Sequence, residues 1–218
     1  MSIISENLNN IKLSLPTDVT LIAVSKTKPV SDLMEAYNAG QRIFGENKIQ
    51  EMTEKWQEMP KDIEWHMIGH VQTNKIKFMI PYVKLIHGVD SLKLLKEINR
   101  LGIKWRKKVN CLLQVSIAQE ETKFGLDESE LNEILDYIKN DDSATNINVV
   151  GLMGMATFTD NQEQIRNEFN YLKCVFDKTQ EKNPNFQILS MGMSGDYQIA
   201  IECGSTMIRI GSSIFGTR

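Results

Sequence analysis

The sequence predicts an α/β protein whose 218 residues form a single (β/α)8 barrel, the TIM-barrel fold. Short apolar runs alternate with helical segments in one uninterrupted series, which is the order of elements in such a barrel. No interior stretch has the composition of a linker, so we expect one domain over residues 1–218. No G-x-G-x-x-G or Walker motif opens the first helix, which disfavours the rival architecture, an open doubly wound sheet.

The expected strands are short and apolar. The first, Val19 to Val24, is rich in β-branched residues and does not alternate with polar ones, which is typical of a strand buried on both faces. The expected strands span residues 19–24, 42–45, 63–68, 84–89, 109–117, 147–155, 186–191 and 207–215. The chain is shorter than the roughly 250 residues usual for this fold, so we expect short loops.

Helical spacing separates these runs. Between Pro29 and Gly40, which suit the start and the end of a helix, Leu33, Met34 and Tyr37 recur at helical intervals. Similar patterns predict helices over residues 48–58, 74–80, 91–101, 127–139, 160–182 and 196–203.

Charge and composition narrow the classes of partner. A net charge of -3 and a pI of about 5.7 argue against general affinity for nucleic acid or an anionic membrane. The first residues lack the basic and apolar regions of a secretory signal, and no apolar run is long enough for a membrane span. We therefore expect a cytoplasmic protein, a monomer, whose partner is a small molecule.

Neither the cysteines nor the histidines predict a metal site. Cys111, Cys174 and Cys203 are widely separated and form no C-x-x-C pair, which is typical of reduced thiols. The three histidines, His66, His70 and His87, lack carboxylate or thiolate companions at ligand spacing.

Lys26 ends the first strand, at the rim where (β/α)8 barrels place their active sites. A lysine amine that follows buried residues is a candidate nucleophile that condenses with an aldehyde. The alternative is that Lys26 and Lys28 are solvated charges at the end of the strand, and position alone favours that interpretation.

Glycines and hydroxyls gather at the last two strands, where barrels commonly bind phosphate. The segments are SMGMS at residues 190–194 and RIGSSIFGTR at residues 209–218. Ser194 precedes a short helical pattern, and Gly216 and Thr217 follow the last strand. The alternative for each residue taken alone is a turn that serves only the backbone.

Arg209 lies within an apolar run and needs a partner, because an unpaired buried guanidinium is costly. A structural carboxylate, Glu202 or Glu46, is one candidate partner, and a ligand's ring nitrogen or phosphate is the other. Asn47 and His66 lie near the same rim, although a lone histidine in an apolar strand is more often part of the core.

Several ordered motifs give the chain a specific resemblance along essentially its whole length. They are AVSKTKP at residues 23–29, FGEN at 44–47, WHMIGHVQTNK at 65–75, KFGL at 123–126, GLMGMA at 151–156, SMGMSGD at 190–196 and GSTMIRIGSSIFGTR at 204–218. The sequence resembles the YggS-type pyridoxal phosphate homeostasis proteins, also called proline synthase co-transcribed homologues. The resemblance implies a barrel similar to the N-terminal domain of alanine racemase, with pyridoxal 5′-phosphate (PLP) held as a Schiff base.

The same resemblance implies the cofactor residues. The Schiff base would form on Lys26, the first lysine of SKTKP, and not on Lys28. Arg209 would face the pyridine nitrogen and Asn47 would lie beside the ring. The remaining implied cofactor residues are Ser194, Gly211, Gly216 and Thr217 around the phosphate, with Met193 and, as a weaker assignment, His66.

The resemblance leaves a carrier and an enzyme to be distinguished. A fixed positive charge at Arg209 disfavours protonation of the pyridine nitrogen and weakens the ring as an electron sink. Racemase-like enzymes also complete their sites with a β-domain, which we do not expect after residue 218. We therefore expect a non-catalytic protein of PLP homeostasis that delivers cofactor to apo PLP-dependent enzymes. The alternatives are a fold-type III enzyme such as an amino-acid racemase, with Lys26 as base, and a protein–protein adaptor.

Overall fold

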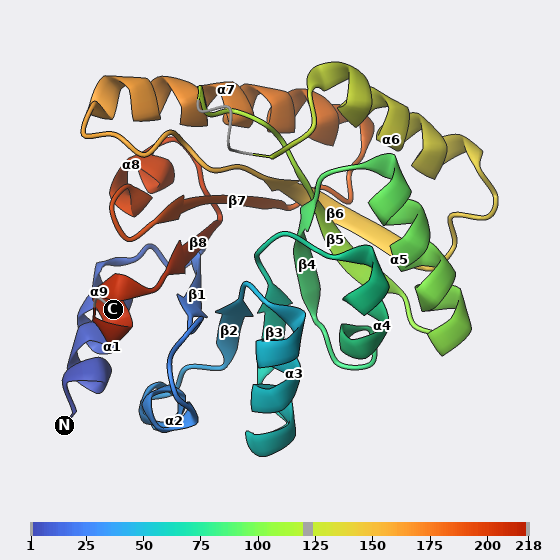
Figure 1. The fold of residues 1–218 in the computed structure, drawn as a ribbon. Helices are drawn as coiled ribbons and strands as arrows, with labels where there is room; N and C mark the ends of the chain where they lie inside the picture. The colour runs from blue at the N-terminus through green and yellow to red at the C-terminus, as the bar shows by residue number, and fades with distance from the viewer. Residues whose placement is uncertain (1, 120–123, 217–218) are drawn as a thin grey trace.

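The computed structural model describes residues 2–119 and 124–216 and confirms the predicted (β/α)8 barrel (Figure 1). The strands are β1 (Thr20–Val24), β2 (Ile43–Glu46), β3 (Glu64–Met67), β4 (Leu85–Val89), β5 (Val109–Gln114), β6 (Ile147–Met153), β7 (Ile188–Met193) and β8 (Met207–Ile210). Each strand pairs in parallel with the next, and β8 pairs with β1 to close the barrel.

Helices surround the closed sheet. They are α1 (Ile3–Ser14), α2 (Val30–Asn38), α3 (Ile49–Glu58), η1 (Thr73–Lys75), α4 (Ile76–Met79), α5 (Leu92–Trp105), α6 (Glu128–Asn140), α7 (Gln162–Lys182), α8 (Tyr197–Glu202) and α9 (Ser212–Phe215). Side-chain caps fix several of these helix starts, as in the capping box of Asp127 and Glu130 on α6. Among the described residues, no helix combines the length and the apolar character needed to cross a membrane.

Two segments at the ends of the chain differ from the prediction. The expected eighth strand over residues 207–215 was wrong in its second half, because the strand stops at Ile210 and Ser212–Phe215 forms the helical turn α9. Gly211 breaks the run, and Ile214 and Phe215 are buried from the helix instead. Helix α1 was not expected; its N-cap is Ser2, and it packs beside α9, which brings the two ends of the chain together (Figure 1).

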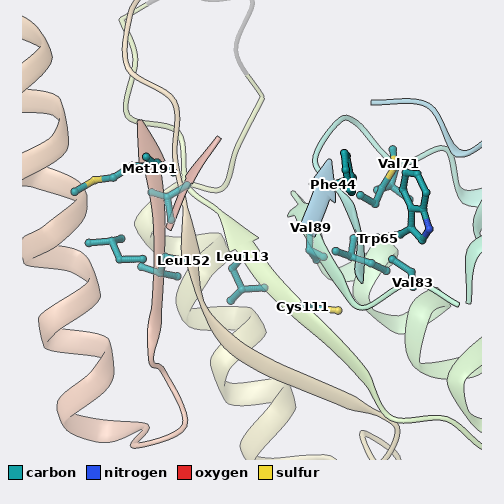
Figure 2. Close-up of a cluster of buried hydrophobic side chains, with 14 of the residues drawn as sticks. Phe44, Trp65, Val71, Val83, Val89, Cys111, Leu113, Leu152 and Met191 are labelled. Carbon is teal, nitrogen blue, oxygen red and sulfur yellow. The ribbon is translucent and has the colours of Figure 1, made fainter. Parts of the chain in front are cut away.

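The hydrophobic core has two parts. The larger one lies between the strands and the helices, and it includes Phe44 and Trp65 on one side of the barrel and Leu152 and Met191 on the other (Figure 2). A smaller cluster of strand residues packs separately from it: Ile22, Leu85, Leu112, Met153 and Met207. Because side chains alternate along a strand, these residues fill the interior of the barrel.

A polar layer lies above this interior cluster. His87 follows Leu85 by two residues on β4, and Arg209 follows Met207 by two residues on β8. Both side chains therefore lie on the same inward face as the cluster. Both are buried, and both contact Ser190 of β7, the strand next to β8. The interior thus changes from apolar to polar toward the carboxyl ends of the strands.

Candidate functional site

A cavity of about 680 Å³ opens at the carboxyl ends of the barrel strands. Residues from β1, β5, β7 and β8 and from the loops that follow the strands line it. Six of the nine predicted cofactor residues are among its lining residues: Lys26, Asn47, Met193, Ser194, Arg209 and Gly211. Residues that are distant in the chain, and that were predicted to share a site, therefore line one cavity.

The loop after β1 places its two lysines differently. Lys26 is partly buried and lines the cavity. Lys28 extends to the C-terminal end of α9, where its Nζ donates to the Phe215 carbonyl at 2.9 Å. The N–H of Lys28 closes a turn onto the Ser25 carbonyl, and Thr27 between them has a φ of 65°, in the left-handed region. This turn separates the two amines.

Ser194 and Gly211 lie together at the corner where the sequence predicts a phosphate site. The Gly211 N–H donates to Ser194 Oγ at 3.2 Å, which leaves the Ser194 hydroxyl proton available to donate elsewhere. Ser212 and Ser213 also line the cavity from the first turn of α9, where N–H groups have no carbonyl partner within a helix. Sequence reasoning missed these two serines because it placed them in a strand.

Gly216, also predicted at the phosphate, is not among the described residues that line the cavity. The N–H of Gly216 donates to the Ser212 carbonyl at 2.9 Å and ends α9, and its φ of +79° is one that glycine adopts without strain. Thr217 lies outside the described residues. Contacts of both with a phosphate remain predictions.

Arg209 has partners other than the predicted carboxylates. Its Nη1 donates to the Ser190 carbonyl at 2.9 Å and to Ser190 Oγ at 2.6 Å, and its Nη2 donates to the Gly154 carbonyl at 3.0 Å. Glu202 instead pairs with Arg166, so the prediction of a structural carboxylate for Arg209 was wrong. Burial lowers the pKa of Arg209 to about 10, a value at which the guanidinium is still charged at neutral pH, and the nearby Asp196 opposes that shift.

The second predicted carboxylate is also engaged elsewhere. Glu46 is completely buried at the end of β2, and its Oε1 accepts from Lys55 Nζ at 2.7 Å and from Ser25 Oγ at 2.6 Å. Desolvation raises the pKa of Glu46, while Lys55 acts in the opposite direction. This buried group lies beside the Lys26 loop and not beside Arg209.

His66 belongs to a chain of buried hydrogen bonds behind Arg209. Its Nδ1 lies 3.1 Å from His87 Nε2, and His87 Nδ1 lies 3.2 Å from Ser190 Oγ. Since Ser190 Oγ accepts from Arg209, its own proton is best directed to His87 Nδ1, which makes His87 Nε2 the donor to His66. His66 does not line the cavity, so its direct contact with a cofactor remains a prediction.

Both histidines of this chain are neutral. Burial lowers the pKa of His66 to about 3, and burial, with repulsion from His66 and Arg209, lowers the pKa of His87 well below its ordinary value. The imidazole beside Ser190, which accepts from Arg209, is therefore uncharged.

Asn47 is packed tightly against a glycine of the next loop. A side chain at Gly69 would place its Cβ 2.6 Å from the Asn47 carbonyl oxygen, so only glycine fits there without displacing Asn47. A Cβ added at Gly88 would likewise lie 2.7 Å from the Gly69 carbonyl oxygen. Neither glycine was predicted as a site residue. The signal in the sequence was that the third and fourth strands both have a glycine at their carboxyl ends.

Aromatic and amide side chains form the opposite rim. His70 lies with its ring 5.4 Å from that of Phe124, and its Nδ1 lies 3.2 Å from Asp90 Oδ2. Gln114 donates to the Phe124 carbonyl at 2.6 Å. His70, Gln114, Phe124 and Phe158 all line the cavity, and none was predicted as a site residue. Within residues 2–119 and 124–216, no group of three or more potential metal ligands occurs.

The chain matches the family model described as "Alanine racemase, N-terminal domain" over residues 1–218. Two relatives named "Pyridoxal phosphate homeostasis protein" illustrate the sequence similarity. The protein of Aquifex aeolicus is 38% identical over 91% of this chain and 86% of its own, and the protein of Homo sapiens is 42% identical over 91% of this chain and 76% of its own.

Solved structures give the same result. PipY of Synechococcus elongatus PCC7942, determined with PLP bound, is 33% identical, has a TM-score of 0.89 and is matched over 98% of this chain and 100% of its own. Alanine racemase of Clostridium difficile 630 shares the fold, with a TM-score of 0.81 at 17% identity, over 56% of its own length. The chain therefore belongs to the alanine racemase N-terminal domain family, and within it to the pyridoxal phosphate homeostasis proteins.

Proposed function

We propose that this chain binds PLP in the barrel cavity, covalently through Lys26, and that it acts in PLP homeostasis as a carrier and not as a catalyst. The observation that carries the proposal is that the Lys26 amine and the Ser194–Gly211 corner open into the same cavity. PLP needs both, because it carries an aldehyde at one side of its ring and a phosphate at another. Relatives named for PLP homeostasis and a PLP-bound structural neighbour support the assignment.

The donor set fits the cofactor. Ser194 offers a hydroxyl, and Ser212 and Ser213 offer the first N–H groups of α9, to an anion. A Cβ at Gly211 would come within 3.1 Å of the Val24 carbonyl oxygen, so a glycine there keeps the backbone close to the first strand. When bound, the cofactor supplies an aldehyde that condenses with the Lys26 amine: a C=N bond forms and one water molecule leaves.

The environment of Arg209 favours a carrier over a carbanion-forming enzyme. Its hydrogen-bond acceptors are two carbonyls and a hydroxyl, and the nearby Asp196 opposes the lowering of its pKa, so the guanidinium keeps its charge at neutral pH. If Arg209 faced the pyridine nitrogen of bound PLP, its positive charge would disfavour protonation of that nitrogen and weaken the ring as an electron acceptor. We propose apo PLP-dependent enzymes as the recipients, and a monomer in the cytoplasm as the working form.

The covalent assignment is tested by a pair of lysine variants. Wild-type protein mixed with PLP should develop a visible absorption band that borohydride discharges, and peptide mapping after reduction should find the label on Lys26. Lys26→Ala should lose the band, whereas Lys28→Ala should keep it, because Lys28 binds the Phe215 carbonyl instead. A Lys26→Ala protein that retained the reducible band would refute the assignment.

The carrier role is tested separately. PLP-loaded protein incubated with a panel of L- and D-amino acids should give no more product than one equivalent per site, whereas an apo PLP enzyme added to it should gain activity. More than one equivalent of product from any amino acid would refute the carrier role and favour a racemase-type enzyme.

A further inference from the structure

A buried lysine on α3 contacts the backbone on which Lys26 is carried. Lys55 Nζ donates to the Ser25 carbonyl at 2.7 Å, to Glu46 Oε1 at 2.7 Å and to Glu51 Oε1 at 2.8 Å. An ammonium group has three protons, so these bonds saturate it. One of them ends on the residue immediately before Lys26.

The residue immediately after Lys26 is held by the same group of charges. Glu51 Oε1 accepts the Thr27 N–H at 2.6 Å, in addition to its bond from Lys55. Thr27 has a φ of 65°, which a β-branched residue adopts only when its surroundings impose it. The carboxylate of Glu51 is the contact that holds the Thr27 amide in this conformation.

Burial makes the arrangement rigid. Glu46 is completely buried and Lys55 is 6% exposed, so neither can exchange its partner for water. Glu46 also accepts from Ser25 Oγ, which ties the side chain of Ser25 to the same carboxylate that binds Lys55. Glu46 Oε2 is buried and has no hydrogen-bond partner among the described residues. The geometry therefore fixes Ser25 through two atoms and Thr27 through one.

The contacts are more specific than fold stabilisation requires. Gln41 is a structural anchor on the same strands for comparison. Its Nε2 donates to the Leu21 and Ile43 carbonyls, at the opposite end of β1 and β2. It touches no residue of the Lys26 loop. Lys55 and Glu51, in contrast, contact the two peptide units that flank Lys26.

We infer that Lys55, Glu46 and Glu51 are positioning residues that hold the turn from Ser25 to Lys28, in which Thr27 is left-handed, so that Lys26 lines the cavity and Lys28 binds the end of α9. The inference rests on the proposed function, because it assigns these charges to the lysine that takes the aldehyde. It adds three residues that do not touch the cofactor but set the rate and the equilibrium of its capture.

The primary test is Glu51→Ala, because Glu51 is partly exposed and its loss does not open a buried space. Removing it should slow formation of the borohydride-reducible band about tenfold and weaken PLP binding. The affinity for inorganic phosphate, measured by competition, should be unchanged because the Ser194–Gly211 corner is intact. Glu51→Gln, which retains an oxygen acceptor for Thr27, should restore most of the rate. Asp177→Ala, which breaks an exposed i,i+4 pair with Lys173, is the matched control and should have no effect.

A second variant tests the buried lysine. Lys55→Met should slow band formation more than Glu51→Ala does, and it is compared with Gln41→Met, which removes a buried backbone anchor on the same strands. The thermal stability of both apo proteins is measured alongside the rate. The inference requires a loss of rate in Lys55→Met that Gln41→Met, at a similar drop in stability, does not show.

The outcomes separate the two proposals. If wild-type protein forms no reducible band on Lys26, the proposed function fails and this inference fails with it. If the wild type forms the band and the Glu51 and Lys55 variants form it at the rate of their controls, or lose phosphate affinity in the same proportion, the positioning role alone is overturned.

Discussion

The hydroxyl of Ser190 accepts a 2.6 Å hydrogen bond from the guanidinium of Arg209 inside the barrel. The two residues belong to neighbouring strands, and both are buried. This contact joins the cavity to the histidine chain behind it, because the same hydroxyl lies 3.2 Å from His87. Ser190 is therefore the residue through which the buried polar layer orients the charge that faces the site.

Replacing Ser190 with alanine should lower the free energy of unfolding by roughly 1–3 kcal/mol, since a buried charged donor loses an acceptor. The absorption maximum of the PLP-loaded protein should also shift, because Arg209 Nη1 then keeps only the Ser190 carbonyl as its acceptor. Urea denaturation and visible absorption measure the two effects. Ser205→Ala removes another buried hydroxyl, which donates only to carbonyls of β7 and β8, and should lower stability without a spectral shift. Equal spectra in the two variants would contradict the role of Ser190.

The neutral histidine pair should make the protein sensitive to acid. The folded-state pKa of His66 is about 3, below the ordinary 6.5, so the unfolded chain binds more protons between these values. Stability should then rise with pH across this window, with a slope of at most about 1.4 kcal/mol per pH unit from each histidine. His66→Asn keeps a polar atom near Nδ1 and removes the titration. Urea unfolding at several pH values should show a flatter profile for the variant below pH 6.5, and parallel profiles would exclude this source of the acid sensitivity.

Gly69→Ala should weaken PLP binding and destabilise the protein by roughly 1–3 kcal/mol, because the new Cβ would lie 2.6 Å from the Asn47 carbonyl oxygen. The loop that carries Asn47 must move to admit it. Gly195 also lines the cavity but has no atom within 4 Å of an added Cβ, so Gly195→Ala is the matched control for thermal stability. A Gly69→Ala protein with wild-type melting temperature and PLP affinity would contradict the prediction, because it would show that the Asn47 loop moves with no loss of stability or binding.

The three cysteines should react at very different rates. Cys174 is exposed on α7, whereas Cys111 and Cys203 are buried, and desolvation raises the pKa of both buried thiols. Because the thiolate is the reactive form, a thiol reagent should label Cys174 in the native protein and the other two only after denaturation. Mass spectrometry of labelled peptides, with Cys174→Ser as the control, decides the order. Rapid native labelling of Cys111 would contradict its burial.

The barrel could be predicted, as could six residues that line the cavity, because their signals are local or follow from the fold. Lys26 and Ser194 each come directly at the end of an apolar run, and a parallel barrel brings the ends of all its strands to one rim. The spacing of Ile4, Leu8 and Ile11 after Ser2 is also helical, so α1 was predictable from the sequence although no helix was predicted there.

The interior partners could not be predicted, because strand order does not fix which inward side chains meet across a barrel. A carboxylate, Glu202 or Glu46, was one of two alternatives for Arg209, and Ser190 and the Gly154 carbonyl accept its hydrogen bonds instead. His66 was placed at the rim because its strand ends there, and its position one layer deeper depends on the register of β3 and β4. The eighth strand was extended too far because a short apolar stretch after glycine fits a strand or one helical turn equally well.

The closure of the barrel has a consequence for how the molecule assembles. Lys26 lies in the loop after β1, which pairs with β8, and β8 ends beside Gly211, so the two halves of the proposed site come from opposite ends of the chain. A ligand that bonds to Lys26 and to the Ser194–Gly211 corner would act as a cross-link between the first and last strands. Such contacts of long sequence separation form late in folding. The site would then exist only in the fully closed molecule, and a nascent chain would have no means of capturing the cofactor until its last strand had joined its first.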